Sequence, residues 1–184
     1  MMQQSTALEA LNQYRPDAAT ATFHDVIRQC VERSEQFWSR SHFEPGHLTA
    51  SAWITNPEKT HVVLLLHGKL GIWVQPGGHI EPEDANLLQA ALREATEETG
   101  LSELSLGQAA IFDVDIHDIP ARKDEPAHQH LDVRYWFTTT MSTLTISDES
   151  SALGWVPLAD VDKMQADESV MRMVAKTLDS KASA

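Results

Sequence analysis

Three glutamates near the middle of the chain have the spacing of a metal-binding cluster. Glu94, Glu97 and Glu98 stand at positions i, i+3 and i+4, so a helix would place their carboxylates on one face. Like charges at this spacing destabilise an isolated helix by roughly 0.2–0.5 kcal/mol per pair, and Arg93 offsets only part of that repulsion through Glu97. A divalent ion that prefers oxygen ligands, such as Mg²⁺, is therefore the expected partner of this face. The alternative is a solvated acidic face with nothing bound.

The flanking residues predict the helix that carries these glutamates. Asp84 is the expected N-cap, and Gly100 suits the position just after the end of a helix. Before the helix, Pro76-Gly77-Gly78 predicts a tight turn in which the backbone can approach a ligand closely. The apolar stripe of the helix is expected to consist of Leu88, Ala91, Leu92 and Ala95.

At these residues the chain resembles the Nudix hydrolase family, whose signature is G-x5-E-x7-R-E-U-x-E-E-x-G-U, where U is a bulky apolar residue. Ala95 fills the first U position, and the chain has one residue more between Gly78 and Arg93 than the signature has. The early glutamate of the signature therefore corresponds to Glu83 or Asp84. The positions that match directly are Arg93, Glu94, Glu97, Glu98, Gly100 and Leu101.

The resemblance extends over about Leu48 to Leu178 and implies the Nudix fold, an α/β fold in which a mixed β-sheet is sandwiched between helices (α/β/α). We expect residues 1–46 to form an N-terminal helical extension packed on the domain, and residues 47–184 to form the Nudix hydrolase domain. The implied activity is metal-dependent hydrolysis of a diphosphate linkage in a nucleoside diphosphate derivative or a related small phosphorylated compound. The implied cofactor is Mg²⁺ or Mn²⁺, held by the Gly77 carbonyl together with Glu94, Glu97 and Glu98.

The same resemblance assigns catalytic roles to Arg93 and the three glutamates, and it adds an acid further along the chain. Glu149 lies six residues before Trp155, where many Nudix proteins carry a loop glutamate ahead of a Trp-x-Pro-Leu strand. Such an acid commonly supplies a further metal ligand or a general base. Glu94, Glu98 and Glu149 all remain candidates for the general base. The alternative for Glu149 is a solvated loop acid.

A second polar pattern follows a proline-bearing loop. If the segment from His128 is a strand, its period of two places His128, His130, Asp132 and Arg134 on one face. We expect this face to bind substrate, with histidine and arginine contacting phosphate oxygens, or else to hold another metal through the two histidines and the aspartate. His79, beside the glycines, is a candidate for either role. The alternative is a face that points into solvent.

Composition limits the remaining possibilities. The length of 184 residues and a hydrophobic content of 42% suit one globular domain with a sizeable core. The net charge of −13 argues against a nucleic-acid partner and requires cations beside any anionic substrate. A single cysteine, Cys30, fits a reducing compartment, and neither a membrane span nor a signal peptide is predicted. We therefore expect a cytoplasmic monomer or homodimer that acts on a small molecule.

The order of predicted elements is that of a mixed α/β protein. Hydrophobic periodicity predicts a helix at about Ala21–Ser39 and a closing helix from Val161 or Asp162 to Leu178. A proline-bearing loop is expected at Ile119–Gln129. Strands are predicted at Leu48–Thr55, His61–His67, Trp73–Gln75, Ile111–Ile116, His130–Thr140 and Trp155–Leu158.

Three other functions are compatible with parts of the pattern. An isoprenoid-diphosphate isomerase of the same fold would need a nucleophilic cysteine in its pocket, and Cys30 lies far in sequence from the glutamates. A non-catalytic nucleotide-sensing module would typically carry a degraded signature and a DNA-binding domain. An unrelated acidic metal-binding protein leaves the glycines and Arg93 unexplained. The pattern therefore favours the hydrolase.

Overall fold

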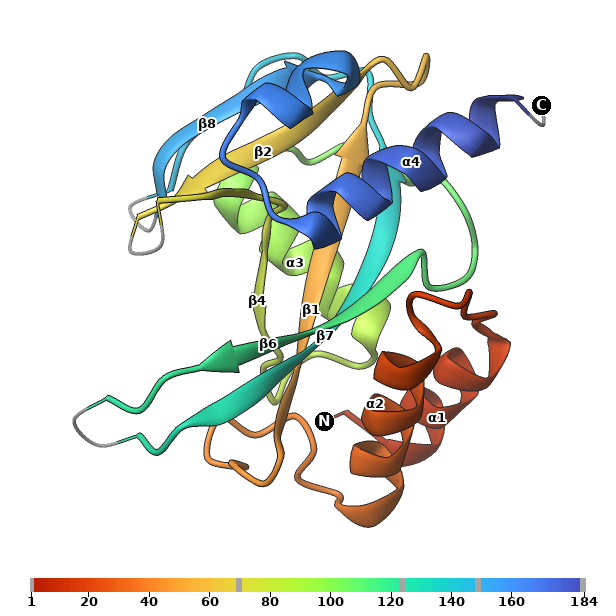
Figure 1. Ribbon diagram of the computed structural model, residues 1–184, viewed down its shortest axis with the longest axis vertical. Helices are drawn as coiled ribbons and strands as arrows, with labels where there is room; N and C mark the ends of the chain where they lie inside the picture. Colours follow the sequence, from red (N-terminus) through yellow and green to blue (C-terminus); the bar gives the residue numbers. More distant parts are fainter. Residues whose placement is uncertain (1, 69–70, 123–124, 148–149, 183–184) are drawn as a thin grey trace. The chain divides into compact units, whose positions relative to one another are not determined.

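The computed structural model describes residues 2–68, 71–122, 125–147 and 150–182, and its ribbon is drawn in Figure 1. The chain divides into two compact units. The first unit contains Met1–Ser51, Gly78–Ala91 and Gln108–Tyr135, and the second contains Ala52–Gly77, Leu92–Gly107 and Trp136–Ala184. Two long strands, β1 (Gly46–Thr55) and β7 (His128–Thr138), and the helix α3 (Leu87–Thr99) continue from one unit into the other.

The first unit combines a helical pair with a long hairpin. Helices α1 (Gln4–Gln13) and α2 (Ala21–Arg33) lie side by side in Figure 1 and bury Leu11, Ile27 and Val31. Strand β6 (Asp113–Ile119) pairs antiparallel with β7, from Asp113 opposite Arg134 to Ile119 opposite His128. This register aligns two acidic positions of β6 with the polar face of β7, because residues directly opposite each other share a face.

The second unit is built around the apolar strand β2 (His61–His67). β2 pairs antiparallel with β1, with the short strand β3 (Trp73–Val74) and with β8 (Ser150–Pro157), while β5 (Ser105–Leu106) pairs with the end of β7. The chain then forms a 3-10 helix at Leu158–Lys163 and the closing helix α4 (Glu168–Ala182). The indole of Trp53 on β1 donates a hydrogen bond of 2.8 Å to Thr177 on α4, which fixes that helix to the strand.

Most predicted elements are present, and the differences have local causes. The strand at His61–His67 has the predicted bounds. The helix predicted to reach Ser39 ends at Arg33, because Ser34 adopts an extended backbone. The closing helix begins later than predicted, where the Asp167 side chain accepts a hydrogen bond of 2.9 Å from the amide of Val170. Helix α1 and strand β5 carry no signal that we identified in the sequence.

The segment around the glutamates differs from the prediction at its start. Gly77–His79 is a short strand, β4, that pairs with β1, instead of a tight turn. Asn86, and not Asp84, caps α3, since its side chain accepts a hydrogen bond of 2.9 Å from the amide of Gln89. Asp84 accepts one from Glu81 within the preceding loop. The buried stripe of α3 is accordingly Leu87, Ala90, Ala91 and Ala95, whereas Leu92 is exposed.

Gly100 ends α3 as predicted. Its φ of +72° is in the left-handed region that favours glycine, and its amide donates a hydrogen bond of 2.9 Å to the carbonyl of Thr96. A Cβ at this position would lie 2.8 Å from the Cβ of Thr145, so the site also has no room for a larger residue. None of the helices in the described ranges is long and apolar enough to cross a membrane.

Candidate functional site

The acidic face of α3 is held together by one arginine. Nη1 of Arg93 lies 2.9 Å from an Oε1 oxygen of Glu94 and 2.9 Å from an Oε2 oxygen of Glu97. Glu94 is mostly buried, with 13% of its side chain exposed, and Glu97 is 58% exposed. Arg93 offsets one of the three negative charges of the cluster, and therefore the face keeps an excess of negative charge suited to a divalent cation.

Glu98 fixes this face to the glycine segment. Its Oε2 oxygen accepts a hydrogen bond of 2.8 Å from the backbone amide of Gly77. This hydrogen bond joins the helix face that carries the three carboxylates to the glycine backbone, and both belong to the second unit. Carboxylate and backbone carbonyl oxygens are the ligands that hard ions such as Mg²⁺ prefer, so the donor set fits the expected cofactor.

The strand β7 includes all four residues of the predicted polar face, from His128 to Arg134, so their side chains lie on one side of the strand. The rings of His128 and His130 have centroids 5.4 Å apart, and Nε of Arg134 donates a hydrogen bond of 2.8 Å to Asp132. The interpretation of this face as one that points into solvent is wrong. His128, Asp132 and Arg134 are all buried, and the Arg134 side chain is fully so.

Arg134 lies within a ring of acidic side chains. Its guanidinium contacts Asp132 at 2.8 Å, Asp113 at 3.3 Å and Asp115 at 3.5 Å, and its Nη2 lies 3.0 Å from a ring nitrogen of His117. Burial is the largest single influence and disfavours ionisation of both Asp132 and Arg134, but the surrounding opposite charges and hydrogen bonds together outweigh it. The pKa of Asp132 is lowered and that of Arg134 is raised. The phosphate contact predicted for Arg134 stays a prediction, since every contact described here is with protein groups.

Asp132 is fully engaged by neighbouring side chains. Its second oxygen accepts hydrogen bonds from the hydroxyl groups of Thr49 at 3.0 Å and Ser51 at 2.8 Å, both on β1. In this region, the side chains whose ligand atoms lie close enough together to share one metal ion are those of His47, His79 and His130. Asp132 is not among them. The histidine partners of His130 therefore come from other strands, and His47 is a residue that the sequence patterns did not single out.

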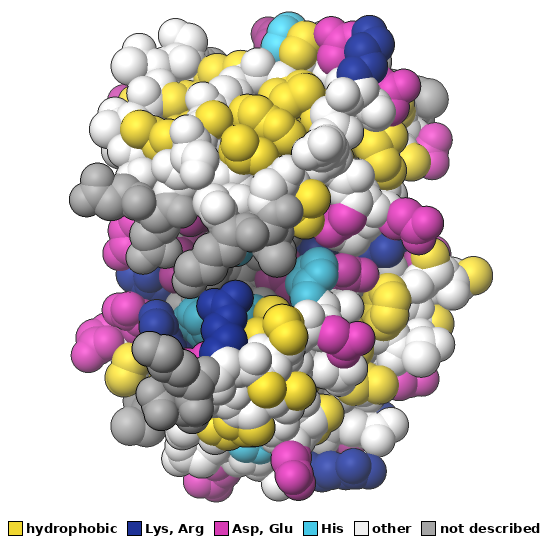
Figure 2. Space-filling view, turned by 60° about the vertical axis from the view of Figure 1, so that its left-hand side comes forward, with side chains coloured by type: hydrophobic (Ala, Val, Ile, Leu, Met, Phe, Trp, Pro, Cys, Tyr) yellow, Lys and Arg dark blue, Asp and Glu magenta, His cyan; other side chains and the backbone are white. Residues whose placement is uncertain are grey.

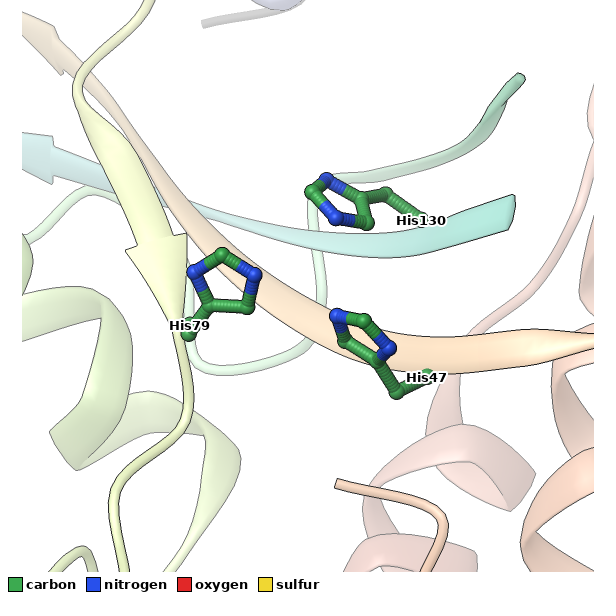
Figure 3. A group of neighbouring side chains, drawn as sticks. All are labelled: His47, His79 and His130. Atoms are coloured by element: carbon green, nitrogen blue, oxygen red, sulfur yellow. The ribbon is translucent and has the colours of Figure 1, made fainter. Parts of the chain in front are cut away.

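The three histidines face one another from strands β1, β4 and β7 (Figure 3). Their ring centroids lie 5.2 Å apart for His47 and His79, 4.9 Å for His47 and His130, and 5.0 Å for His79 and His130. One ligand nitrogen from each ring lies within 4.8 Å of the others. His47 is buried, whereas His79 and His130 are partly exposed. Histidine side chains reach the surface beside basic and acidic side chains on the face drawn in Figure 2.

These three imidazoles are uncharged at neutral pH. Burial is the largest cause that lowers the pKa of His79 to about 4 and that of His130 to about 3. Arg40 and neighbouring histidines contribute to the lowering for His79, and neighbouring histidines for His130. The pKa of His47 is also lowered, again chiefly by burial. A neutral imidazole offers a hydrogen bond or a lone pair but no positive charge. The cluster therefore lacks the charge that would attract a phosphate group.

Other predicted positions are placed as follows. Glu149 lies outside the described residues. Glu83 is exposed and Asp84 is buried in its loop, so the two candidates for the early signature acid have different surroundings.

Cys30 is buried, and burial raises the pKa of its thiol to about 11. A protonated thiol is a poor nucleophile, which counts against the isomerase chemistry.

Comparison with known proteins identifies the family. Residues 45–176 match the NUDIX domain family. The chain is 30% identical over 145 residues to a probable DHNTP pyrophosphohydrolase of Lactococcus lactis subsp. cremoris (strain MG1363), covering 77% of this chain and 80% of the relative. The chain therefore belongs to the Nudix family, whose members generally use divalent metal ions and act on small phosphorylated substrates.

Solved structures share the fold. A NUDIX-family hydrolase from Clostridium perfringens is 30% identical, with a TM-score of 0.56 over 72% of this chain and 96% of that one. The E. coli dihydroneopterin triphosphate pyrophosphohydrolase has a TM-score of 0.55 at 15% identity, over 69% and 91% of the two chains, and this likeness concerns the fold alone. The predicted α/β fold with a mixed sheet and flanking helices is confirmed, and the chain is a pyrophosphate-cleaving hydrolase.

Proposed function

We propose that the protein is a Mg²⁺- or Mn²⁺-dependent pyrophosphohydrolase of the cytoplasm that acts on a nucleoside diphosphate derivative or a related small phosphorylated compound. Dihydroneopterin triphosphate is the first substrate to test, because the Lactococcus relative is described as a probable pyrophosphohydrolase of DHNTP. One buried cysteine, Cys30, is compatible with a reducing compartment. The proposal covers a monomer or a homodimer.

The observation that carries this proposal is the hydrogen bond between Glu98 and the Gly77 amide. This contact joins the acidic face of α3 to the glycine backbone, so side-chain and main-chain oxygen ligands come from one compact unit. In the proposal, Glu94, Glu97, Glu98 and the Gly77 carbonyl hold the divalent ions. When bound, such ions neutralise the diphosphate, polarise its phosphorus and lower the pKa of a bound water.

The protein groups have separate roles in this scheme. Arg93 contacts Glu94 and Glu97 and restricts the positions that their carboxylates can take. A carboxylate among Glu94, Glu98 and Glu149 removes a proton from the attacking water, whose oxygen then bonds to phosphorus as the bond to the leaving phosphate breaks. Glu98 accepts a hydrogen bond from the Gly77 amide and Glu94 accepts one from Arg93, so all three carboxylates stay candidates for the base in this proposal.

The residues predicted to bind substrate divide into two groups. His79 and His130 are partly exposed and can meet a bound molecule, whereas Asp132 and Arg134 are buried. We assign Asp132 and Arg134 a positioning role, because their ion pair lies on the same strand, β7, as His128 and His130 and restricts the conformation of that strand.

The test is a substrate panel assayed for released phosphate and pyrophosphate, with and without Mg²⁺, using wild type, Glu98→Gln and the control Glu103→Gln. The panel includes dihydroneopterin triphosphate, nucleoside triphosphates and nucleotide sugars. Changes around metal sites lower activity by about 10–100-fold even outside the ligand set, so Glu98→Gln should cost roughly 100-fold or more. Glu103 is exposed and lies outside the cluster, so its variant should match wild type. Near-normal turnover of Glu98→Gln in saturating Mg²⁺ would refute the site.

A further inference from the structure

We propose that His47, His79 and His130 form a binding site for a zinc-class divalent cation. The three side chains come from three strands, β1, β4 and β7, and all belong to the first unit. Their ligand nitrogens lie within 4.8 Å of one another, and Figure 3 shows one nitrogen of each ring turned toward the space between them. The site has nitrogen donors only, in contrast to the oxygen donors of the glutamate cluster.

His47 is prepared to be a ligand by its hydrogen bonding. Its Nδ1 lies 3.2 Å from the carbonyl oxygen of His42. A carbonyl oxygen only accepts, so Nδ1 carries the proton and Nε2 keeps its lone pair. That Nε2 atom is buried and has no hydrogen-bond partner among the described residues. An unpartnered buried polar atom is costly, and a metal bond would satisfy it.

The arrangement resembles the general design of histidine metal sites. A ligating histidine usually donates its other ring nitrogen to a carbonyl or carboxylate, which fixes the tautomer and the orientation of the ring. The contact between His47 and the His42 carbonyl has this form. His128 lies next to the cluster, with its ring centroid 5.1 Å from that of His47, and its Nδ1 is fixed in the same way, 2.9 Å from the carbonyl of Pro126.

The donor set indicates which class of ion would bind. Imidazole nitrogen suits Zn²⁺, Co²⁺ and Ni²⁺, whereas Mg²⁺ prefers oxygen. A Zn–N bond is about 2.0–2.1 Å long, so a bound ion would draw the three rings closer together than they stand. Three protein ligands leave a fourth position of a tetrahedral ion for water or an anionic oxygen, which is the pattern of open zinc sites. The partial exposure of His79 and His130 leaves that position accessible.

A phosphate-binding role explains the same residues less well. Such a role leaves the lone pair of His47 Nε2 unsatisfied, because a phosphate oxygen is an acceptor and cannot donate to it. A cation satisfies all three nitrogens at once.

The experiment uses Co²⁺ as a spectroscopic probe of the full-length protein. Metal-stripped wild type is titrated with Co²⁺ in the presence of excess Mg²⁺, which occupies oxygen sites, and visible absorption is recorded. We expect one equivalent of Co²⁺ to bind with the intense d–d bands of a four-coordinate ion, and Zn²⁺ to displace it. His130→Gln and His47→Gln should weaken Co²⁺ binding by at least about 10-fold, the lower end of the effect of changes around metal sites.

Two controls keep the result specific. His61→Gln removes a histidine of β2 outside the cluster and should bind Co²⁺ as wild type does. Glu98→Gln should also keep the spectrum, which separates this site from the glutamate cluster of the proposed function. Circular dichroism melts identify a variant that fails to fold, and His79→Gln then replaces it. The proposal is overturned if wild type gives no four-coordinate spectrum, or if the folded cluster variants bind Co²⁺ as tightly as wild type.

Discussion

At the scale of single residues, Arg134 shows how burial changes the meaning of a charged side chain. Its guanidinium is fully buried and contacts three aspartates, two of them on the neighbouring strand β6. Buried ion pairs contribute little net stability when complete, because desolvation offsets attraction, but removing one partner leaves charges that nothing balances. The stability of the hairpin formed by β6 and β7 therefore depends on this arginine more than on any exposed ion pair.

We predict that Arg134→Met destabilises the protein strongly. Loss of one member of a buried ion pair costs about 3–5 kcal/mol, and here three carboxylates would remain in the interior. The free energy of unfolding is measured by denaturant titration monitored by circular dichroism. Arg28→Met is the matched control, because Arg28 forms an exposed pair with Glu32 on α2 and such pairs contribute about 0–1 kcal/mol.

A different outcome would restore the substrate role of this residue. If Arg134→Met unfolds at the same denaturant concentration as wild type but loses activity, the guanidinium of Arg134 serves the substrate and the structural role is wrong.

The sequence could not separate the structural role of Arg134 from a role in substrate binding. Strand alternation indicated that His128, His130, Asp132 and Arg134 share a face, which is confirmed, but it gave no information on the partner strand. The register that places Asp113 and Asp115 opposite this face is a tertiary property.

The same reasoning explains why His47 was missed. A polar alternation of His47, Thr49 and Ser51 is visible in the sequence of β1. In the structure, Thr49 and Ser51 donate hydrogen bonds to Asp132 on β7. One histidine beside a Pro-Gly turn has no distinctive spacing, however. The cluster appears only when β1, β4 and β7 are brought together.

At the scale of elements, α3 shows which parts of a helix a sequence predicts well. The glutamate spacing, the Arg93–Glu97 pair and the terminal Gly100 are all found as expected, since they depend on local geometry. The start of the helix differs because Asn86, two residues after the predicted cap Asp84, is also a residue type that caps helices, and its side chain accepts a hydrogen bond from the first turn. The strand β4 depends on pairing with β1, and no local signal distinguishes it from a glycine turn.

We predict that Gly100→Ala destabilises the protein more than Gly71→Ala. Both glycines have positive φ values, of +72° and +66°, and an L-residue in the left-handed region costs roughly 1–2 kcal/mol. Gly71 has open space around its Cβ position, whereas a Cβ at Gly100 would lie 2.8 Å from that of Thr145. Thermal melts of the two variants isolate the steric part of the cost. Equal melting temperatures would mean that the segment around Thr145 moves freely away.

At the scale of the whole molecule, we expect the negative charge and the glutamate cluster to make the stability of the fold depend on metal. A ligand that binds only the folded state raises the free energy of unfolding by RT ln(1 + [L]/Kd), which is about 2.7 kcal/mol at 100 times Kd. The net charge of −13 adds general repulsion that cations relieve. Only the folded chain places Glu98, and with it the acidic face of α3, against the Gly77 segment.

We therefore predict that Mg²⁺ raises the melting temperature of EDTA-treated wild type and has little effect on Glu98→Gln. For a chain of this size, each kcal/mol shifts the melting temperature by roughly 2–4 °C. Differential scanning calorimetry across millimolar Mg²⁺ measures the shift, with K⁺ at equal ionic strength as the control for screening. A shift that persists in full in Glu98→Gln, or equals that given by K⁺, would indicate general charge screening instead of a specific site.

The single cysteine also gives this protein a built-in reporter of unfolding. Cys30 lies in α2, is buried, and its sulfur contacts the carbonyl oxygen of Gly46 at 3.7 Å. With the pKa of the thiol raised to about 11, little thiolate exists in the folded state near neutral pH, and alkylating reagents act on the thiolate. Pulses of such a reagent followed by mass measurement would count the molecules whose helical pair has opened, without any added label. Each molecule that opens during the pulse would gain one mass increment.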